Sequence, residues 1–224
     1  MKIAELFYSV QGEGVLTGVP SVFVRTSGCN LRCQWCDTPY TSWRPEGTEW
    51  PLDQIVAEVR AHQARHVVVT GGEPMIAPEI VALTTRLRDA GMHITIETAG
   101  TVFQPVACDL MSISPKLSNS TPGDRRWAAQ HDRLRIQPAV LSELMERYDY
   151  QLKFVIAEPA DLEEVRALVD VLKADRERVV LMPEGTDRDR LRERGRWIAE
   201  VCKDEHFRFS PRLHVDLWGD VRGV

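Results

Sequence analysis

Short apolar and β-branched runs recur along the 224 residues of the chain, and their lengths are typical of buried strands. They are KIAELF, SVFVRT, HVVVT, HITIET, DLMSIS, LKFVIA and RVVLMP. Between several of these runs, apolar residues recur at three- and four-residue intervals, which indicates amphipathic helices. The clearest helix is expected over residues 161–173, with Leu162, Val165, Leu168, Val169 and Leu172 on one face. Strands that alternate with helices predict a parallel sheet.

The number of strands limits how such a sheet can close. Six or seven runs are available, whereas a closed eight-unit barrel takes roughly 250 residues with its loops. An incomplete barrel or an open α/β sheet fits this length better. We expect an α/β fold of the first kind, an incomplete TIM-like barrel of about six parallel strands with helices outside, in a single domain over residues 1–224.

Polar and glycine-containing motifs follow four of the predicted strands. The segment from Ser27 to Cys36 follows SVFVRT, GGEP follows HVVVT, TAGT follows HITIE, and SPK follows DLMSI. In barrels and in open parallel sheets alike, reactive groups gather at the C-terminal ends of the strands. We therefore expect the four motifs to meet at one edge of the sheet.

Composition and charge restrict the class of protein and its partners. A charged fraction of 27% and a hydrophobic fraction of 43% are those of an ordinary globular protein. A formal net charge of −5 argues against a protein whose main task is to bind a phosphate backbone, so we expect no nucleic-acid partner. No apolar run approaches the roughly 18 residues of a membrane helix, and the N-terminal segment lacks the features of a signal peptide. We expect a cytoplasmic protein without a membrane partner.

Three of the five cysteines, Cys29, Cys33 and Cys36, lie within eight residues of one another. A structural zinc site usually has four ligands and no fourth lies nearby, while a redox dithiol would leave one of the three unused. Thiolates also hold iron–sulfur clusters, for which four ligands are usual. Three cysteines would leave one iron open to another ligand. Cys108 and Cys202 are isolated, and we expect them to pack in the core.

The spacing of this cysteine loop resembles the signature of the radical S-adenosylmethionine (SAM) superfamily. It reads C-x-x-x-C-x-W-C, with Trp35 before the last cysteine, and it follows a strand directly. The resemblance implies a four-iron, four-sulfur (4Fe-4S) cluster on the three cysteines, whose open iron chelates the amino and carboxylate groups of SAM. An electron passed into the sulfonium then gives methionine and a deoxyadenosyl radical, which abstracts hydrogen from the substrate. In such a protein the cofactor carries the chemistry and the chain positions it.

The GGEP motif is expected to hold the methionine end of SAM. Gly71 and Gly72 have no side chains and therefore let the backbone approach a ligand closely. An ordinary strand-to-helix turn with Pro74 would use the same residues. The position of the motif, at the next strand end after the cysteine loop, favours the cofactor role.

Further motifs narrow the resemblance. SVQGEG, FVRTSGCNLRC, CDT, ETAGT, SISPK and the terminal LWGDVRGV together resemble the 7-carboxy-7-deazaguanine synthase family of queuosine biosynthesis. That resemblance implies a carbon–nitrogen lyase, in which 6-carboxy-5,6,7,8-tetrahydropterin undergoes ring contraction to 7-carboxy-7-deazaguanine and releases ammonia. It also implies a magnesium ion (Mg2+), a flavodoxin-like electron donor and a homodimer.

The same resemblance assigns residues to the substrate and to SAM. Those implied for the pterin are Val10, Gln11, Gly12, Arg25, Thr98 and the terminal Val224. Those implied for SAM are Gln34, Trp35, Asp37, Gly72, Ser114, Pro115, Lys116, Lys153, Met182, Pro183 and Glu184. The guanidinium of Arg25 suits the pterin carboxylate because it offers two parallel hydrogen bonds, although an ion pair within the protein would also use it. Lys116 and Lys153 could equally be solvated lysines.

Three further positions affect the chemistry. Thr38 resembles the family's magnesium ligand, and magnesium commonly takes only one or two protein oxygens. The alternative is a hydroxyl that bonds the turn before Pro39. Ala99 stands where many family members are expected to have a polar residue, so its backbone or a neighbour must serve instead. No residue stands out as a proton donor or acceptor, and Glu13 is only a candidate.

Two other functions remain open at this point. A glycyl-radical-enzyme activase has a similar cysteine spacing but acts on a protein, and it would not explain VQGEG, CDT and LWGDVRGV together. An iron–sulfur electron carrier would need no open iron, so three ligands instead of four argue against it.

Overall fold

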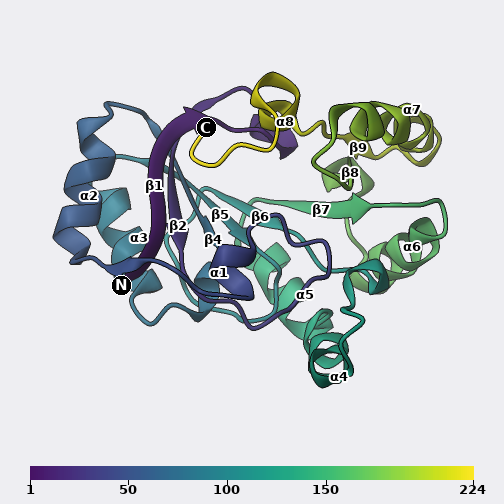
Figure 1. Cartoon of the computed structure of the whole chain (residues 1–224), viewed down its shortest axis with the longest axis horizontal. Helices are drawn as coiled ribbons and strands as arrows, with labels where there is room; N and C mark the ends of the chain where they lie inside the picture. Colours follow the sequence, from purple (N-terminus) through teal and green to yellow (C-terminus); the bar gives the residue numbers. More distant parts are fainter.

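The structure, a computed structural model, describes residues 1–224 and contains one curved sheet of nine strands (Figure 1). The strands are β1 (Lys2–Val10), β2 (Pro20–Thr26), β3 (Thr48–Glu49), β4 (His66–Gly71), β5 (His93–Thr98), β6 (Leu110–Ile113), β7 (Tyr150–Ile156), β8 (Val179–Pro183) and β9 (Arg208–Phe209). Their spatial order is β3-β1-β2-β4-β5-β6-β7-β8-β9, and β2 and β4 to β9 are parallel. The edges β3 and β9 do not pair, so the predicted incomplete barrel is confirmed.

The N-terminal run differs from the predicted parallel arrangement. β1 pairs antiparallel with β2, and β3 pairs antiparallel with β1. Only residues 11–19 join β1 to β2, and they contain no crossover helix beyond the 3-10 turn η1 (Gly14–Leu16). A parallel neighbour needs a crossover of a dozen or more residues, which explains why this pair is antiparallel.

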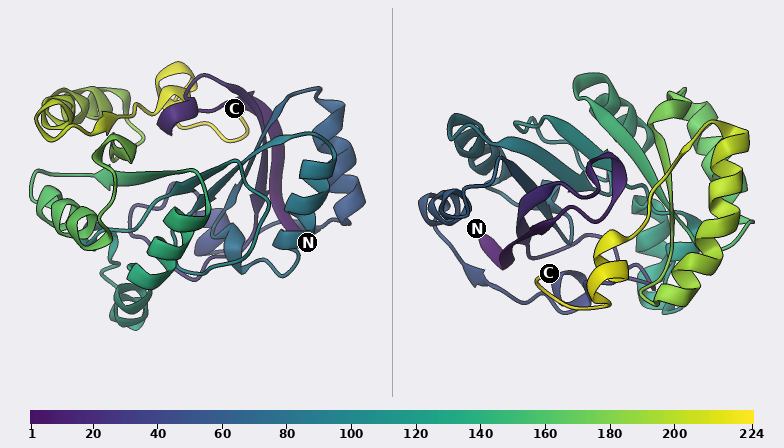
Figure 2. Two further views of the ribbon diagram at one scale, coloured as in Figure 1. Left: turned by 180° about the vertical axis from the view of Figure 1, so that it is seen from behind. Right: turned by 90° about the horizontal axis from the view of Figure 1, so that it is seen from above.

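Helices cover the outer face of the sheet, as Figures 1 and 2 show. The longer ones are α2 (Leu52–Ala61), α3 (Ile80–Asp89), α5 (Pro138–Arg147), α6 (Asp161–Leu172) and α7 (Arg188–Glu205). The remaining helices are α1 (Pro39–Ser42), α4 (Arg125–Leu134) and α8 (Leu213–Trp218), with the 3-10 turns η2 (Pro74–Ile76), η3 (Ser118–Ser120) and η4 (Arg176–Arg178). The helix predicted over 161–173 is α6, and its five predicted apolar residues are all buried. None of the helices is both long and apolar enough to cross a membrane.

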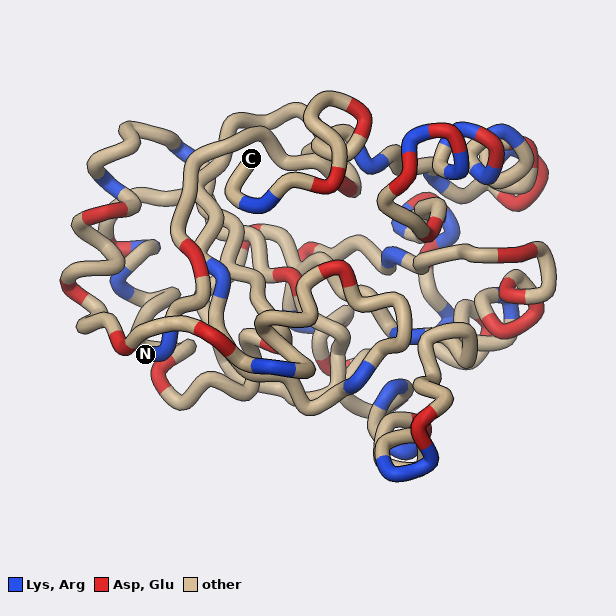
Figure 3. The backbone as a smooth tube through the Cα atoms, viewed as in Figure 1, with Lys and Arg blue, Asp and Glu red and all other residues tan.

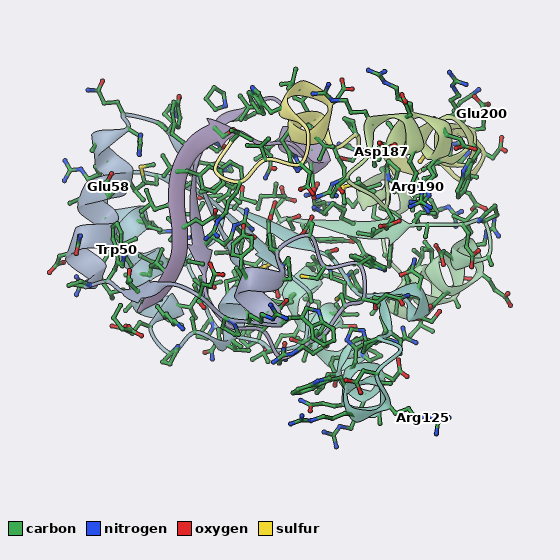
Figure 4. The ribbon with its side chains drawn as sticks, in the orientation of Figure 1. Trp50, Glu58, Arg125, Asp187, Arg190 and Glu200 are labelled. Carbon is green, nitrogen blue, oxygen red and sulfur yellow. The ribbon has the colours of Figure 1, made fainter.

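The hydrophobic core lies between the sheet and these outer helices. Its fully buried members include Ile55, Leu83, Ile96, Phe154 and Ile198. Charged side chains gather on the outward faces of α2 and α7, where Figure 4 labels Glu58 and Glu200 and Figure 3 marks alternating charges along α7. The C-terminal segment lies on the inner side of β1, opposite α2 (Figures 1 and 2). The inner side of the sheet is therefore left for a site.

Candidate functional site

A cavity of about 340 Å³ opens on the inner side of the sheet, at the C-terminal ends of the parallel strands. The cysteine loop, residues of β2 and of β4 to β8, and the C-terminal segment line it, so the predicted motifs do meet at one edge. The predicted site residues among its lining are Val10, Gln11, Gly12, Arg25, Cys29, Cys33, Trp35, Cys36, Asp37, Thr38, Gly72, Thr98, Ser114, Lys116, Lys153, Met182 and Val224.

Four of the residues predicted for SAM do not line this cavity: Gln34, Pro115, Pro183 and Glu184. Gln34 is exposed, and its side-chain amide donates to the carbonyl oxygen of Asn119 at 2.6 Å. Glu184 lines an adjoining pocket that shares Trp35 and Met182 with the cavity. Its carboxylate is bound by Arg194 of α7. The side chains of Gln34 and Glu184 are therefore already engaged by the protein.

The cysteine loop leaves β2 after Thr26 and runs to α1. Cys33 is buried, Cys29 and Cys36 are half-buried, and all three are free thiols that line the cavity. The Cys29 sulfur accepts the backbone N–H of Leu31 at 3.4 Å, and the Cys36 sulfur lies 3.2 Å from the Ser42 hydroxyl. Hydrogen bonds to sulfur stabilise a thiolate, so the loop already provides part of what a metal ligand requires.

Burial raises the pKa of the Cys29 thiol to about 12 and that of Cys33 to about 11. Since the thiolate is the form that ligates metals, these sulfurs need a cationic partner to ionise at neutral pH. No three His, Cys, Asp or Glu side chains converge closely enough to ligate one metal ion. The arrangement does not suit a single zinc ion, whereas a cluster with several irons can bond sulfurs that stand apart.

The two glycines of GGEP pack against the cysteine loop. A Cβ on Gly72 would lie 2.2 Å from the Gly28 oxygen and 2.7 Å from the Cys29 Cβ, and one on Gly71 would lie 2.3 Å from the Thr26 hydroxyl. The next residue, Glu73, donates its backbone N–H to the Gly28 oxygen at 2.9 Å. Glycine is thus required here so that the end of β4 can touch the loop, and Gly72 also lines the cavity.

Glu73 ties GGEP to the end of β5. Its side chain is fully buried, and its carboxylate accepts hydrogen bonds from the Thr98 hydroxyl and the Ala99 N–H, both at 2.7 Å, and from the Met75 N–H at 3.0 Å. The Ala99 methyl packs with Leu31 and Cys33. At position 99 the backbone therefore forms the polar contact, and the side chain supports the cysteine loop.

The SPK segment after β6 lies beside the aromatic residue of the cysteine loop. The Lys116 ammonium donates to the hydroxyl and carbonyl oxygens of Ser114 at 2.8 and 2.9 Å, and it lies 5.9 Å from the centre of the Trp35 ring. The Trp35 indole donates to the Asn119 carbonyl oxygen at 3.0 Å. Lys116 is thus held as a fixed positive charge near the cysteines.

A network of buried ion pairs crosses the cavity. Glu13 pairs with Lys153 and, at 3.1 Å, with Nε of Arg212, whose terminal nitrogen also binds Asp37. The side chains of Lys153 and Arg212 are only 6% and 8% exposed, so Lys153 is not a solvated lysine. Burial alone would raise the pKa of Glu13, but the two cations outweigh it and hold that pKa well below its usual value. The network therefore connects Asp37 after the cysteine loop with Glu13 of the N-terminal motif through side chains of alternating charge.

Polar groups from β4, β5 and the segment that follows β1 meet in the cavity. The Gln11 side-chain amide donates to the Glu97 carboxylate at 3.1 Å, and the Thr70 hydroxyl donates to the same carboxylate at 3.0 Å. Gly12 lies against the His214 ring, since a Cβ there would come within 2.0 Å of Nδ1. Gln11 is 4% exposed, so these groups present a largely desolvated polar surface to the cavity.

Glu5 gathers three side chains at the mouth of the cavity. Its carboxylate accepts from Arg25 Nε and the Tyr40 hydroxyl, each at 2.8 Å, and from Arg222 of the C-terminal segment. We call these four residues the Glu5 cluster. Arg25 therefore does form an ion pair within the protein, but only through Nε. Its two terminal nitrogens form no hydrogen bond with the chain.

The C-terminal segment and Thr38 complete the same side of the cavity. Arg222 lies over the Tyr40 ring at 3.9 Å and pairs with Glu46 at 3.2 Å. Two residues later, Val224 lines the cavity and its carboxylate forms no ion pair with the chain. Thr38 begins α1 without a side-chain capping hydrogen bond, and its hydroxyl lies 3.8 Å from the Cys36 sulfur. The Thr38 hydroxyl is thus not used by the turn before Pro39.

Comparisons with known proteins agree with this arrangement. Residues 23–115, which include the cysteine loop, GGEP and the first two residues of SPK, match the family model of the Radical SAM superfamily. A 7-carboxy-7-deazaguanine synthase from Halobacterium salinarum is 47% identical over 99% of this chain and 91% of its own, and one from Rhodopirellula baltica is 43% identical over 99% and 88%. The crystal structure of QueE from Escherichia coli superposes with a TM-score of 0.71 at 28% identity, covering 95% of this chain and 94% of that one.

This chain belongs to the 7-carboxy-7-deazaguanine synthase family. As a member of that family it is a radical SAM enzyme, and the sequence prediction of its activity class is confirmed. The family uses a 4Fe-4S cluster and SAM, so the three cysteines of the loop are the thiolates available for the cluster. The glycyl-radical-enzyme activase and the electron carrier are both excluded by these similarities.

The cavity of this family member suits both groups. The cysteine thiols face the cavity without a disulfide between them, and the fixed charge of Lys116 offsets negative charge beside them. Gly72 and Ser114 bring strand-end backbone to the cavity, where the amino and carboxylate groups of SAM would find polar partners. The donor set therefore fits a thiolate-held cluster with a polar ligand next to it.

Several residues that line the cavity of this synthase were not predicted from its sequence. Glu5, Tyr40, Glu97, Arg212 and His214 all line the cavity and none was assigned to it. Glu97 directly precedes the recognised Thr98, and Arg212 precedes the recognised C-terminal motif, so proximity to those motifs was the available signal. Nothing in the sequence indicates that Glu5 would meet a residue 217 positions away.

Proposed function

We propose that this protein converts 6-carboxy-5,6,7,8-tetrahydropterin to 7-carboxy-7-deazaguanine with loss of ammonia, in a single radical SAM domain over residues 1–224. One observation carries the proposal: the cysteine loop and the polar side chains of Arg25, Gln11 and Glu97 line a single cavity. We further propose a homodimer and a flavodoxin-like electron donor.

The chain's own residues bind and orient the pterin. The free terminal nitrogens of Arg25 bind its carboxylate, because guanidinium and carboxylate match in two parallel hydrogen bonds. Glu97 and Gln11 accept hydrogen bonds from the N–H groups of the pyrimidine ring. Gly12 leaves room for the His214 ring beside them, and Val10 and Thr98 line the pocket. When bound, the cluster and SAM would supply the radical that removes hydrogen. Ser114, Lys116 and Lys153 keep the charges around SAM fixed, with Trp35, Asp37 and Met182 completing its surroundings.

Thr38 is the proposed ligand of Mg2+. Thr38 lines the cavity and its hydroxyl lacks a capping role, which leaves the oxygen for a hard cation whose other ligands are substrate oxygens and water. A Thr38→Ala variant is expected to lose the dependence of turnover on added Mg2+ while keeping iron and SAM cleavage. An undiminished Mg2+ dependence would place the ion elsewhere.

The carboxylate of Val224 is proposed to bind the substrate. It lines the cavity without an ion pair, and Arg222 holds the segment two residues before it. One glycine added after Val224 should therefore raise the KM for the pterin sharply with little change in iron content. Unchanged kinetics would remove this role.

Anaerobic reconstitution followed by an assay with the pterin, SAM and dithionite tests the proposed function. We expect 7-carboxy-7-deazaguanine and ammonia in equal amounts, with faster turnover when Mg2+ is added. Formation of deoxyadenosine without any deazaguanine would show that another molecule is the substrate.

A further inference from the structure

Helix α4 lies directly beside the cysteine loop, although it contributes nothing to the cavity (Figure 1). The backbone N–H of Arg32, the residue before Cys33, donates to Nδ1 of His131 at 3.1 Å. His131 is 1% exposed, and its other ring nitrogen lies 2.9 Å from the Ser120 hydroxyl. Ser120 in turn accepts the backbone N–H of Gln34 at 2.9 Å. The helix is thus fastened to the loop on both sides of Cys33.

The exposed side of α4 carries arginines without acidic partners. Arg125, Arg126 and Arg133 are exposed and form no ion pair, whereas Arg135 is paired with Asp132 and Glu164. Arg32 of the cysteine loop adds a fourth positive charge that no carboxylate offsets, because its guanidinium donates to the carbonyl oxygens of Cys29 and Leu31. Figure 3 shows these positive charges on α4, and Figure 4 labels Arg125 at its outer end. We call Arg32, Arg125, Arg126 and Arg133 the α4 patch.

The α4 patch stands out because the chain as a whole is acidic, with a net charge of −5. A local surface of opposite sign to the rest of the molecule steers a partner of complementary charge to one orientation. The Trp127 ring in the patch has the guanidinium groups of Arg32 and Arg126 over it at 4.8 and 5.2 Å, so it is already stacked and does not offer a platform to a base. An acidic protein therefore fits this surface better than a nucleic acid.

We infer that the α4 patch is the docking surface for an acidic one-electron donor protein, which reduces the cluster. The inference rests on the proposed radical chemistry, because the cluster has to gain one electron from outside before SAM can be cleaved. The reduced flavin of the donor loses the electron and the cluster gains it, with no atom transferred. The patch and the cysteine loop share Arg32, so a protein seated there lies next to the cluster ligands.

The test compares two electron sources on the same reconstituted protein, with SAM and the pterin present. One source is dithionite, which needs no docking surface, and the other is a purified flavodoxin with an acidic surface, kept reduced by its reductase. The variant is R125E/R126E/R133E, which leaves Arg32 and the cysteine loop untouched. Acidic residues in the first turn of a helix are favourable, so two of the three changes do not weaken α4.

The control variant R190E/R196E/R208E reverses three exposed arginines on α7 and β9, which likewise form no ion pair. We expect R125E/R126E/R133E to lose about 10-fold or more in kcat/KM for flavodoxin at low salt, the size of steering effects of this kind. Its dithionite-driven rate should stay unchanged, and its flavodoxin-driven rate should lose the salt dependence of the original. The control should keep both rates.

Each outcome separates the two ideas. If the unaltered protein makes no deazaguanine with dithionite, the proposed function fails. If it does, but R125E/R126E/R133E accepts electrons from flavodoxin as well as the control does, the docking surface lies elsewhere on the protein. In that case, binding of tRNA by the unaltered protein that R125E/R126E/R133E loses would assign the α4 patch to a nucleic acid. If the triple variant does not fold, the single variant Arg126→Gln decides, because a flavodoxin KM equal to that of Arg190→Gln would overturn the inference.

Discussion

The buried ion network gives the sharpest prediction of stability. Glu13→Gln keeps the size of the side chain but removes the negative charge between Lys153 and Arg212. Both cations are less than one-tenth exposed, so water cannot replace the lost carboxylate. Removing one partner from a buried pair costs about 3–5 kcal/mol, and Asp37 still compensates Arg212, so we expect a loss near the lower end, about 3 kcal/mol.

Urea unfolding of the purified, reduced protein measures this loss. The matched control is Glu200→Gln, which breaks the exposed pair with Lys203 and should change the free energy of unfolding little. The double variant Glu13→Gln/Lys153→Met should recover part of the stability, because it no longer buries an unpaired ammonium. A Glu13→Gln loss no greater than that of the control would refute the reasoning.

The same pair sets a pH window. Burial disfavours both charges, but the attraction between them outweighs burial. The pKa of Glu13 is therefore lowered from 4.5 and that of Lys153 is raised from 10.5. A carboxylate whose pKa is lowered by folding contributes fully to the free energy of unfolding above its unfolded pKa, and this contribution is lost as the pH falls through its folded pKa. A lysine whose pKa is raised by folding contributes fully below its unfolded pKa, and this contribution is lost as the pH rises through its folded pKa. The difference in the free energy of unfolding between the original protein and Glu13→Gln should therefore be constant from about pH 5 to pH 10 and become smaller below and above this range.

Two further predictions concern the loop and the cavity mouth. Gly72→Ala would press a methyl group into the cysteine loop at a cost of about 1–3 kcal/mol, and iron bound per chain should fall after reconstitution. Gly123→Ala, where a Cβ meets nothing within 4 Å, should bind iron normally, and equal iron in both would contradict the packing argument. Glu5→Gln removes the charge that holds Arg25 and the C-terminal segment, so the KM for the pterin should rise about 10-fold, as expected for one charge-assisted hydrogen bond. Glu46→Gln, which touches only the segment, should raise it less; equal effects would count against the Glu5 cluster.

Local patterns were enough to predict the fold and the position of the motifs. The strand ends carry the cysteine loop, GGEP and SPK to one edge because parallel strands share a direction, and this is a property of sequence order alone. The helical face of α6 likewise follows from residue spacing. The orientation of β1 was not predictable from its apolar pattern, because alternation is the same in parallel and antiparallel pairs.

The paired side chains of the site could not be predicted from the sequence. Glu13 meets Arg212 across 199 positions, and their contact depends on how far the barrel curves before it stops. Glu184, which is implied for SAM by its place after β8, has its carboxylate bound by Arg194, ten positions further along, and no pattern in the sequence indicates that pair. Such choices of partner are decided by packing in three dimensions, while the sequence shows only that a charge is present.

The most direct test of the proposed function follows hydrogen from the substrate. The pterin, labelled with deuterium on the carbons of its reduced ring, is incubated anaerobically with the reconstituted protein, SAM, Mg2+ and dithionite, and both SAM and deoxyadenosine are examined by mass spectrometry. Because the overall reaction releases only ammonia and is redox-neutral, SAM is re-formed in each turnover. The account therefore predicts deuterium in SAM and in any deoxyadenosine, together with 7-carboxy-7-deazaguanine, and none of these in a Cys33→Ala variant. 7-Carboxy-7-deazaguanine that forms while neither SAM nor deoxyadenosine carries deuterium would contradict the claim that this cavity places the pterin beside SAM.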